Sequence, residues 1–246
     1  MNIKIFKRFL SYNGGLEFQQ LSDEVVEANY QHKYVVEKYL NYIKDKKVLD
    51  AGCWTGPIEK EIVKRGIHTE LIGIDENERA LNVATKKFSE FRFIQCGLTK
   101  PSKEFISKYN GYFDTIIFLD VIEHLPKGSE VEVMKFFNKI LKPDGVIIIS
   151  TMASHIFNFI DPAWFVGHRH YKLKGISKIL KEVGFKAVET SQIGNLYWDI
   201  DLLLFYIHKH LLKKKYQMSK NIYKKIMRGF NHPRIATRIY LLAKKI

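Results

Sequence analysis

An acidic residue beside two glycines could hold a ligand in the stretch 48–56. Asp50 follows two apolar residues, and a turn with glycines at its first and last positions comes directly after Ala51. Because glycine has no side chain and adopts unusual backbone angles, it allows a tight turn and lets a ligand approach the backbone. A carboxylate at such a turn attracts a cationic or hydroxyl-rich ligand and repels phosphate. Together, Asp50, Gly52, Cys53 and Gly56 predict a ligand-binding turn.

A second acidic residue lies where it could bind a sugar. Asp75 follows the apolar segment 69–74 and comes 25 residues after Asp50. One carboxylate can accept hydrogen bonds from both vicinal hydroxyls of a ribose. Asp75 is also in position to cap the helix expected after it, and the two roles are compatible. The dinucleotide fingerprint G-x-G-x-x-G is not met, because its middle glycine is absent.

Two stretches with histidine supply candidates for a general base. Histidine is the usual proton acceptor near neutral pH. His124 comes four residues after Asp120, and G-H-R-H-Y at 167–171 precedes a predicted helix at 175–183. The candidate catalytic groups are therefore His124, His168, His170 and Tyr171. A structural role for His124 and a solvated loop at 167–171 are the alternatives.

A metal ion is an alternative use of the same region. Asp120, Glu123 and His124 are spaced so that one helical turn would project all three to one side. Their carboxylate oxygens and imidazole would suit Mg²⁺ or Mn²⁺, and His168 or His170 could complete the ligand set. We favour a site without metal, so no residue is assigned as a metal ligand.

The segments that position these residues alternate between strand and helix. Apolar runs predict strands that end at 50, 74, 96, 120 and 150, with helical periods between them. This alternation predicts an α/β fold with a doubly wound, mostly parallel sheet. Ligands of such sheets bind at the carboxyl ends of the strands, which is where the two acidic residues and His124 come.

Two motifs at matching distances resemble those of a known enzyme family. V-L-D-A-G-C-W-T-G at 48–56 resembles V-L-D-x-G-C-G-x-G, the first motif of class I S-adenosylmethionine-dependent methyltransferases. The stretch 113–125 resembles their F-D-x-x-x-x-x-x-V-x-E-H-L signature, and L-K-P-D-G at 141–145 is a variant of their L-K-P-G-G turn. The resemblance covers residues 28 to 190 and is to small-molecule members such as those of the ubiquinone pathway. It implies a Rossmann-like methyltransferase fold and S-adenosyl-L-methionine as methyl donor.

The resemblance also implies roles for residues near the strand ends. The family commonly has an acidic residue after the third strand, and here the backbone of Cys96 and Gly97 would serve the adenine edge instead. Asp75 would bind the ribose. Related members carry an H-x-x-x-Y/F element near position 168 that lines the acceptor pocket. The residues assigned to the cofactor are Asp50, Gly52, Cys53, Gly56, Asp75, Cys96, Gly97, Leu119 and Asp120.

Charge is unevenly distributed along the 246-residue chain. Lys and Arg number 40 against 26 Asp and Glu, a net charge of +14. No acidic residue follows Asp201, and 12 of the basic residues come after it, so the first 201 residues have 28 basic and 26 acidic side chains, a net charge of +2. We expect three parts: an N-terminal helical cap at 1–44, a methyltransferase domain at 45–200 and a basic amphipathic helical tail at 201–246.

The tail has apolar residues at helical spacing among lysines and arginines, first at 222–230 and then at 235–246. Basic amphipathic helices with aromatic residues suit an anionic membrane surface, which residues 202–246 would contact. The same charge would suit the phosphates of nucleic acid. A third alternative is that the apolar faces pack on the domain and leave the lysines solvated.

Cysteine usage and the absence of leader signals predict the compartment. Cys53 and Cys96 have no C-x-x-C neighbours, which favours a reducing, intracellular setting. The N-terminus does not resemble a signal peptide, and no apolar run reaches the roughly 18 residues of a membrane span. We therefore expect a cytoplasmic protein that is peripheral on the inner face of the membrane.

The function that these observations favour is S-adenosylmethionine-dependent O-methylation. The expected acceptor is a small molecule, a glycan or a lipid-linked intermediate met near the membrane surface. One alternative is metal-assisted 2′-O-methylation of RNA, which the metal site described above would serve. Another is a non-catalytic binding protein that keeps the fold.

Overall fold

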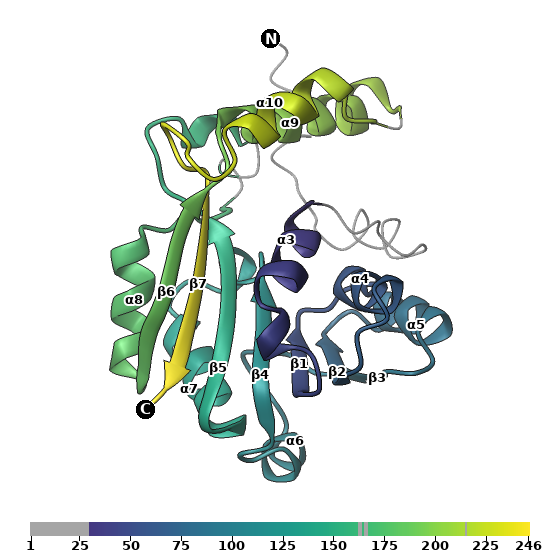
Figure 1. The fold of residues 1–246 in the computed structure, drawn as a ribbon, viewed down its shortest axis with the longest axis vertical. Helices are drawn as coiled ribbons and strands as arrows, with labels where there is room; N and C mark the ends of the chain where they lie inside the picture. Colours follow the sequence, from purple (N-terminus) through teal and green to yellow (C-terminus); the bar gives the residue numbers. More distant parts are fainter. Residues whose placement is uncertain (1–29, 162–163, 165–166, 215) are drawn as a thin grey trace.

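The computed structural model describes residues 30–161, 164, 167–214 and 216–246, and Figure 1 shows its fold. Its strands are β1 (Lys47–Ala51), β2 (Glu70–Asp75), β3 (Arg92–Gln95), β4 (Phe113–Leu119), β5 (Leu141–Met152), β6 (Phe185–Ile193) and β7 (Arg238–Lys245). They form one seven-stranded sheet in the order β3-β2-β1-β4-β5-β7-β6. All neighbours pair in parallel except β7, which is antiparallel to β5 and β6. The predicted α/β fold with a doubly wound, mostly parallel sheet is confirmed.

Helices cover both faces of the sheet (Figure 1). They are α3 (Tyr30–Lys38), α4 (Pro57–Lys64), α5 (Glu78–Lys87), α6 (Lys103–Lys108), α7 (Glu130–Ile140), α8 (Leu173–Glu182), α9 (Leu196–Tyr206) and α10 (Lys220–Arg228). Buried residues of α3, α4, α9 and α10 share one apolar cluster with the sheet, and those of α6, α7 and α8 share another. Short turns of 3-10 helix, η1 (Leu40–Tyr42), η2 (Ile122–His124) and η3 (Asn158–Ile160), and a π-helical turn, η5 (Ile207–Leu212), complete the helical elements that we describe.

The central strands are apolar because both of their faces are covered. In β4 the run Ile116–Phe118 is fully buried, and in β5 the run Ile147–Ile149 is buried as well. Continuous apolar runs of this kind are typical of parallel strands between two helical layers. The chain moves from β1 to β2 on one side and returns later to β4 on the other. The carboxyl ends of β1 and β4 therefore form the point of the sheet where ligands are expected.

The C-terminal segment corrects one expectation. The helix predicted over 235–246 is wrong, because Arg238–Lys245 forms β7 in the interior of the sheet. Side chains of this strand alternate between the two apolar clusters, with Ile239 and Leu241 on one face and Tyr240 and Leu242 on the other. A continuous apolar run fits a helical spacing and a buried strand equally well. The last residues are thus part of the sheet.

The other expected helices fall partly within the described chain. The helix predicted over 222–230 is present as α10, which lies beside α9 near the carboxyl ends of the central strands (Figure 1). Residues 1–29 of the helical cap expected at 1–44 lie outside the described residues, and the described part of that segment contains α3 and η1. The division at residues 44 and 200 stays a prediction. Among the described helices, none combines the length and apolar character needed to cross a bilayer.

Candidate active site

The turn after β1 is tied to the end of β2. The backbone N–H groups of Gly52 and Cys53 both donate to the carbonyl of Ile74, at 2.7 and 3.0 Å. Gly52 has a φ of +87°, in the left-handed region that favours glycine. A Cβ atom on Gly52 would lie only 2.4 Å from Cγ2 of Val121, which follows β4. Two strand-end loops therefore approach one another closely, and the approach requires a glycine.

Asp75 joins the same turn to the start of α5. Its Oδ2 atom accepts the backbone N–H of Trp54 at 3.0 Å, and its Oδ1 atom accepts that of Asn77 at 2.9 Å. The cap of α5 is Asn77, whose side chain accepts the N–H of Ala80. Asp75 therefore supports the turn, and Asn77 rather than Asp75 caps α5. Its assignment to a ribose stays a prediction.

Two buried carboxyl groups lie beside the turn. Asp50 is 4% exposed and Glu59, in α4, is fully buried. Both carboxylate oxygens of Glu59 have no hydrogen-bond partner among the described residues. Burial, and then the charge of Asp75, raise the pKa of Asp50 to about 8. Burial, and then the charge of Asp50, raise the pKa of Glu59 well above its usual value. A cationic ligand would stabilise both carboxylates, so these residues fit a ligand of that charge.

Glu59 was not predicted from the sequence. It lies between Ile58 and Ile62 in a helix whose apolar residues face the core, and nothing in that spacing marks it as a site residue. The signal that could have found it is an acidic residue in the first turn after a glycine-rich loop.

These shifted pKa values predict a fall in stability with rising pH. A carboxyl group whose folded pKa is raised contributes stability that is present below its unfolded pKa, near 4, and is lost as pH rises through its folded pKa. For Asp50 that window runs up to about pH 8. We expect Asp50→Asn to remove this part of the pH dependence. From pH 5 to 9, the melting temperature of wild type should therefore fall relative to that of the variant. Parallel melting curves across that range, measured without ligand, would contradict the assignment.

The end of β3 lies next to this turn. The N–H of Cys96 donates to the carbonyl of Asp75 at 2.9 Å. Cys96 is buried, and burial raises the pKa of its thiol to about 11, which keeps it protonated and unreactive. No atom lies within 4 Å of the position that a Cβ of Gly97 would take. The two residues assigned to the adenine edge therefore stand beside Asp75, with open space at Gly97.

The end of β4 presents Asp120 to helix α3. Asp120 has a φ of +53°, its N–H donates to the carbonyl of Ser150 at 3.0 Å, and its carboxylate accepts the Ser150 hydroxyl at 2.8 Å. Burial lowers the pKa of His32, in α3, to about 4, against the opposing charge of Asp120. Leu119 thus ends β4 and Asp120 follows it, at the position expected for the methionine side of the cofactor.

The predicted histidines come together beyond β4. The rings of His124 and His168 have centroids 4.7 Å apart. His124 is exposed to solvent, so its imidazole is accessible as a proton acceptor. The Glu123 carboxylate accepts the Thr151 hydroxyl at 2.9 Å, and burial, then the charge of Asp120, raise its pKa to about 7. Two strand-end segments far apart in sequence therefore form one polar cluster.

A buried carboxylate that the sequence did not predict organises this cluster. Asp161 is fully buried, and its Oδ2 atom lies 2.8 Å from Nδ1 of His168 and 2.9 Å from Nε2 of His170. His124 is exposed to solvent, whereas the His170 side chain is only 1% exposed. Of the histidines predicted as catalytic, His124 is thus the exposed one, whereas His168 and His170 are both held by Asp161.

Tyr171 holds the turn that bears His124. Its hydroxyl donates to the carbonyl of Ile122 at 3.1 Å and to Glu130 at 3.0 Å, and burial raises its pKa above the usual value. Arg169 donates to the same carbonyl at 2.7 Å. These contacts fix η2 from the side of the loop before α8.

Comparisons with known proteins agree with this geometry. A profile of the methyltransferase-domain family matches residues 27–190, about two thirds of the chain. The chain belongs to this family. It is a class I enzyme that uses S-adenosylmethionine as methyl donor, and the orphaned oxygens of Glu59 beside the glycine turn fit that cationic ligand.

Relatives of this methyltransferase are distant. It is 26% identical over 211 residues to the ubiquinone biosynthesis O-methyltransferase of Histophilus somni, covering 81% of this chain and 84% of that protein. A SAM-dependent methyltransferase from Archaeoglobus fulgidus has the same fold, with a TM-score of 0.59, 19% identity, and coverage of 87% of this chain and 92% of the other. Phosphoethanolamine N-methyltransferase 2 of Haemonchus contortus, solved with S-adenosyl-L-methionine, has a TM-score of 0.63 and 16% identity. The match covers 98% of this chain and 60% of the other chain.

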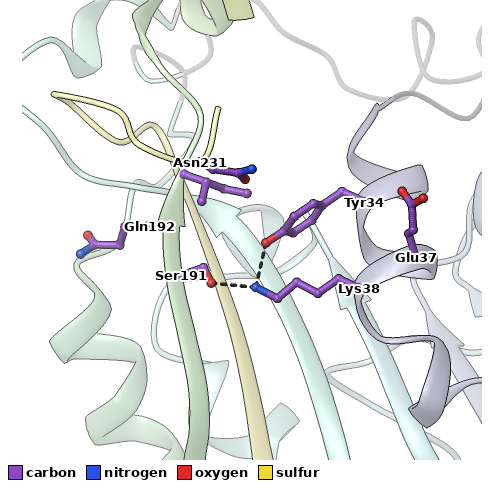
Figure 2. Close-up of a pocket in the computed structure, with 7 residues that line it drawn as sticks. Tyr34, Glu37, Lys38, Ser191, Gln192 and Asn231 are labelled. Carbon is purple, nitrogen blue, oxygen red and sulfur yellow. Dashed lines mark hydrogen bonds between the residues drawn. The ribbon is translucent and has the colours of Figure 1, made fainter. Parts of the chain in front are cut away.

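A groove of about 580 Å³ lies elsewhere on the methyltransferase, between α3 and the end of β6 (Figure 2). In this groove Lys38 Nζ donates to the hydroxyls of Tyr34 and Ser191, at 2.9 and 3.0 Å, and pairs with Glu189 at 2.6 Å. The groove is lined by Tyr34, Glu37, Lys38, Ser191, Gln192, Ile193 and Asn231. None of the residues assigned to the cofactor lines it, so the groove is distinct from the strand-end site.

Proposed function

We propose that this methyltransferase methylates an oxygen atom of a small molecule, or of a glycan or lipid-linked intermediate met at a membrane surface. The observation that carries the proposal is the exposed imidazole of His124, beside His168, in the turn that follows β4 and Asp120. A hydroxyl acceptor needs a base, and this arrangement supplies one next to the cofactor turn. The O-methyltransferases among the relatives support an oxygen acceptor.

The residues around the turn would hold the donor. Asp50 and Glu59 would balance its positive charge, Asp75 would accept hydrogen bonds from its ribose hydroxyls, and Cys96 and Gly97 would meet its adenine edge. Leu119 and Asp120 would contact its methionine part, with Gly52, Cys53 and Gly56 letting it approach the backbone. When bound, the cofactor supplies an electrophilic methyl group on a cationic sulfur.

His124 would act on the acceptor. Its neutral imidazole would take the proton of the acceptor hydroxyl as the oxygen attacks the methyl group. His168, held by Asp161, would pack against the His124 ring, while His170 and Tyr171 would support these groups from within. Holding donor and acceptor in line can contribute an effective molarity of about 10⁵ M or more.

The acceptor class can be found with methyl-labelled S-adenosylmethionine. The enzyme would be incubated with extract of its source cells, and the products separated into lipid, glycan, RNA and small-molecule fractions. We expect label in a lipid, glycan or small-molecule fraction, and none with an Asp50→Ala control. Label confined to RNA would overturn the proposal, and failure of the wild type to bind S-adenosylhomocysteine would point to a non-catalytic protein.

One observation favours the RNA alternative. Ligand atoms of Glu123, His124 and His168 all lie within 4.8 Å of one another, an arrangement that could hold a divalent metal ion for 2′-O-methylation. Asp120 is outside this group. Activity abolished by chelator, together with label in RNA, would support this alternative.

The end of the molecule near α10 supports the membrane part of the proposal. We call its exposed residues the terminal face: Leu211, Leu212, Lys213, Lys214, Lys220, Tyr223, Lys224, Lys225, Met227 and Arg228. Large apolar side chains on it are well exposed, among them Leu211 at 59% and Tyr223 at 47%. Lysines beside exposed apolar side chains fit an anionic lipid surface, where both kinds of group are stabilised.

Neutralising three lysines of the terminal face should weaken membrane binding. At about 1 kcal/mol for each basic residue near an anionic surface, Lys220→Gln, Lys224→Gln and Lys225→Gln together should reduce vesicle affinity about 100-fold. Sedimentation with vesicles of anionic phosphatidylglycerol would measure the loss. The matched control replaces three exposed lysines elsewhere, Lys86, Lys87 and Lys103, with Gln, and should leave binding unchanged. An equal loss in the control, or no binding by the wild type, would refute the membrane part.

A further inference from the structure

We propose that Asp161, His168 and His170 bind a divalent transition-metal ion that fixes the loop over residues 154–171. Two imidazoles converge on one carboxylate oxygen, with His168 Nδ1 at 2.8 Å and His170 Nε2 at 2.9 Å from Asp161 Oδ2. The three side chains are enclosed: that of Asp161 is 0% exposed, that of His168 11% and that of His170 1%. These three enclosed side chains can therefore serve together as metal ligands.

The spacing of the ligand atoms is close to what an ion needs. One ligand atom from each residue can be chosen so that all three lie within 4.8 Å of one another. Ligands of a tetrahedral zinc ion, at about 2.0–2.1 Å from the metal, lie about 3.3 Å apart, so each imidazole nitrogen needs to move only about half an ångström away from Asp161 Oδ2. The remaining ring nitrogens, His168 Nε2 and His170 Nδ1, are buried without a hydrogen-bond partner among the described residues. No described partner therefore opposes this small adjustment of the rings.

The donor set selects the kind of ion. Two imidazole nitrogens with one carboxylate suit zinc, iron and related first-row ions, whereas Mg²⁺ prefers oxygen ligands in an octahedral arrangement. The second group that could hold an ion, Glu123 with His124, shares His168 with this one. We assign the ion to the group around Asp161 because its side chains already meet at one atom, and because His124 is exposed.

An ion bound to these ligands would hold two parts of the segment 154–171 together. The two ends of the loop are pinned together, since Ser154 donates to the carbonyl of Tyr171 at 2.7 Å and Tyr171 donates to that of Met152 at 2.9 Å. Asp161 lies in the middle of the loop, and His168 and His170 lie at its far end. An ion would therefore tie the middle of the loop to its end and would stabilise the native state alone. This role does not depend on the proposed methyl acceptor.

Zinc binding to the full chain tests the proposal. Protein stripped with chelator would be titrated with ZnCl₂ by calorimetry, and its melting temperature measured with and without the ion. We expect wild type to bind one Zn²⁺ with a rise in melting temperature, and an equal concentration of Mg²⁺ to give neither effect. His170→Gln and Asp161→Asn should each weaken zinc binding by more than about 100-fold, beyond the 10- to 100-fold typical of residues that only orient a ligand.

The control variant is His124→Gln, which leaves the three ligands intact and should bind zinc as wild type does. Loss of zinc in His124→Gln with full binding by His170→Gln would overturn the proposal and move the ion to Glu123, His124 and His168. Absence of zinc binding by wild type would overturn it as well, and would leave a hydrogen-bonded cluster. Should the His170 variant fail to fold, Asp161→Asn and Glu123→Gln give an independent answer, because only the change at Asp161 should lose zinc.

Discussion

Replacing Gly52 with alanine should reduce affinity for S-adenosylhomocysteine at least about 100-fold, which corresponds to about 2.7 kcal/mol. An alanine Cβ would lie 2.4 Å from Cγ2 and 3.2 Å from Cγ1 of Val121, so the loops after β1 and β4 must move apart. The φ of +87° adds the strain of a left-handed backbone for a residue with a side chain. Since both loops are assigned to the cofactor, their separation should disrupt its site. Isothermal titration calorimetry would measure the affinity.

Two controls isolate the cause of this loss. Gly66 also has a positive φ, of +62°, but nothing lies within 4 Å of its Cβ position, so Gly66→Ala carries the backbone strain without the clash. It should bind as wild type does. Adding Val121→Ala to Gly52→Ala removes the clashing methyl groups. The Gly52→Ala change should therefore cost less affinity in a Val121→Ala background than in wild type. Equal losses in both glycine variants, or no rescue by the second change, would contradict the account of this turn.

A His124→Gln variant should transfer methyl groups between about 100-fold and 10⁴-fold more slowly than wild type. Glutamine keeps the polarity and approximate size of the side chain, but it cannot accept the acceptor's proton. Affinity for S-adenosylhomocysteine should not change, because His124 is assigned to the acceptor side. The rate would be followed as label entering the acceptor fraction identified with wild type.

The matched control for this variant is His68→Gln. His68 is 87% exposed, pairs with Asp45 at 2.9 Å, and lies just before β2, at the opposite end of the strands from the site. Its transfer rate should equal that of wild type. Full activity of His124→Gln would remove His124 from the mechanism, and a matching loss of cofactor affinity would assign it to the donor side instead.

The sequence predicted that Asp50, Asp75 and His124 would come at the carboxyl edge of the sheet, because parallel strands bring their carboxyl ends together there. Their roles toward the cofactor stay predictions. Asp50 and Asp75 lie within the last two residues of β1 and β2, and Asp120 directly follows β4, so their proximity follows once the strand order is set. The glycine at position 52 has a similar origin, since a turn directly after a strand must bend sharply. The close approach of Val121 to that glycine, however, depends on packing between two loops, which spacing alone does not specify.

The parts that the sequence did not predict depend on contacts between distant segments. The contact of Asp161 with His168 and His170 depends on tertiary packing that their spacing in the sequence does not specify. Glu59 is buried because α4, which bears it, packs against the sheet. The error at β7 has a different cause. Its apolar run suits both a helix and a strand. It forms a strand because it pairs with β5 and β6, and the sequence alone does not show that pairing.

Hydrogen–deuterium exchange with and without S-adenosylhomocysteine tests most directly where the cofactor binds. We predict added protection at residues 50–56, 74–77, 96–97 and 119–121, where the strand-end loops meet. Protection at the groove formed by Tyr34, Lys38 and Ser191, with none in the strand-end loops, would contradict the assignment of the cofactor to this site.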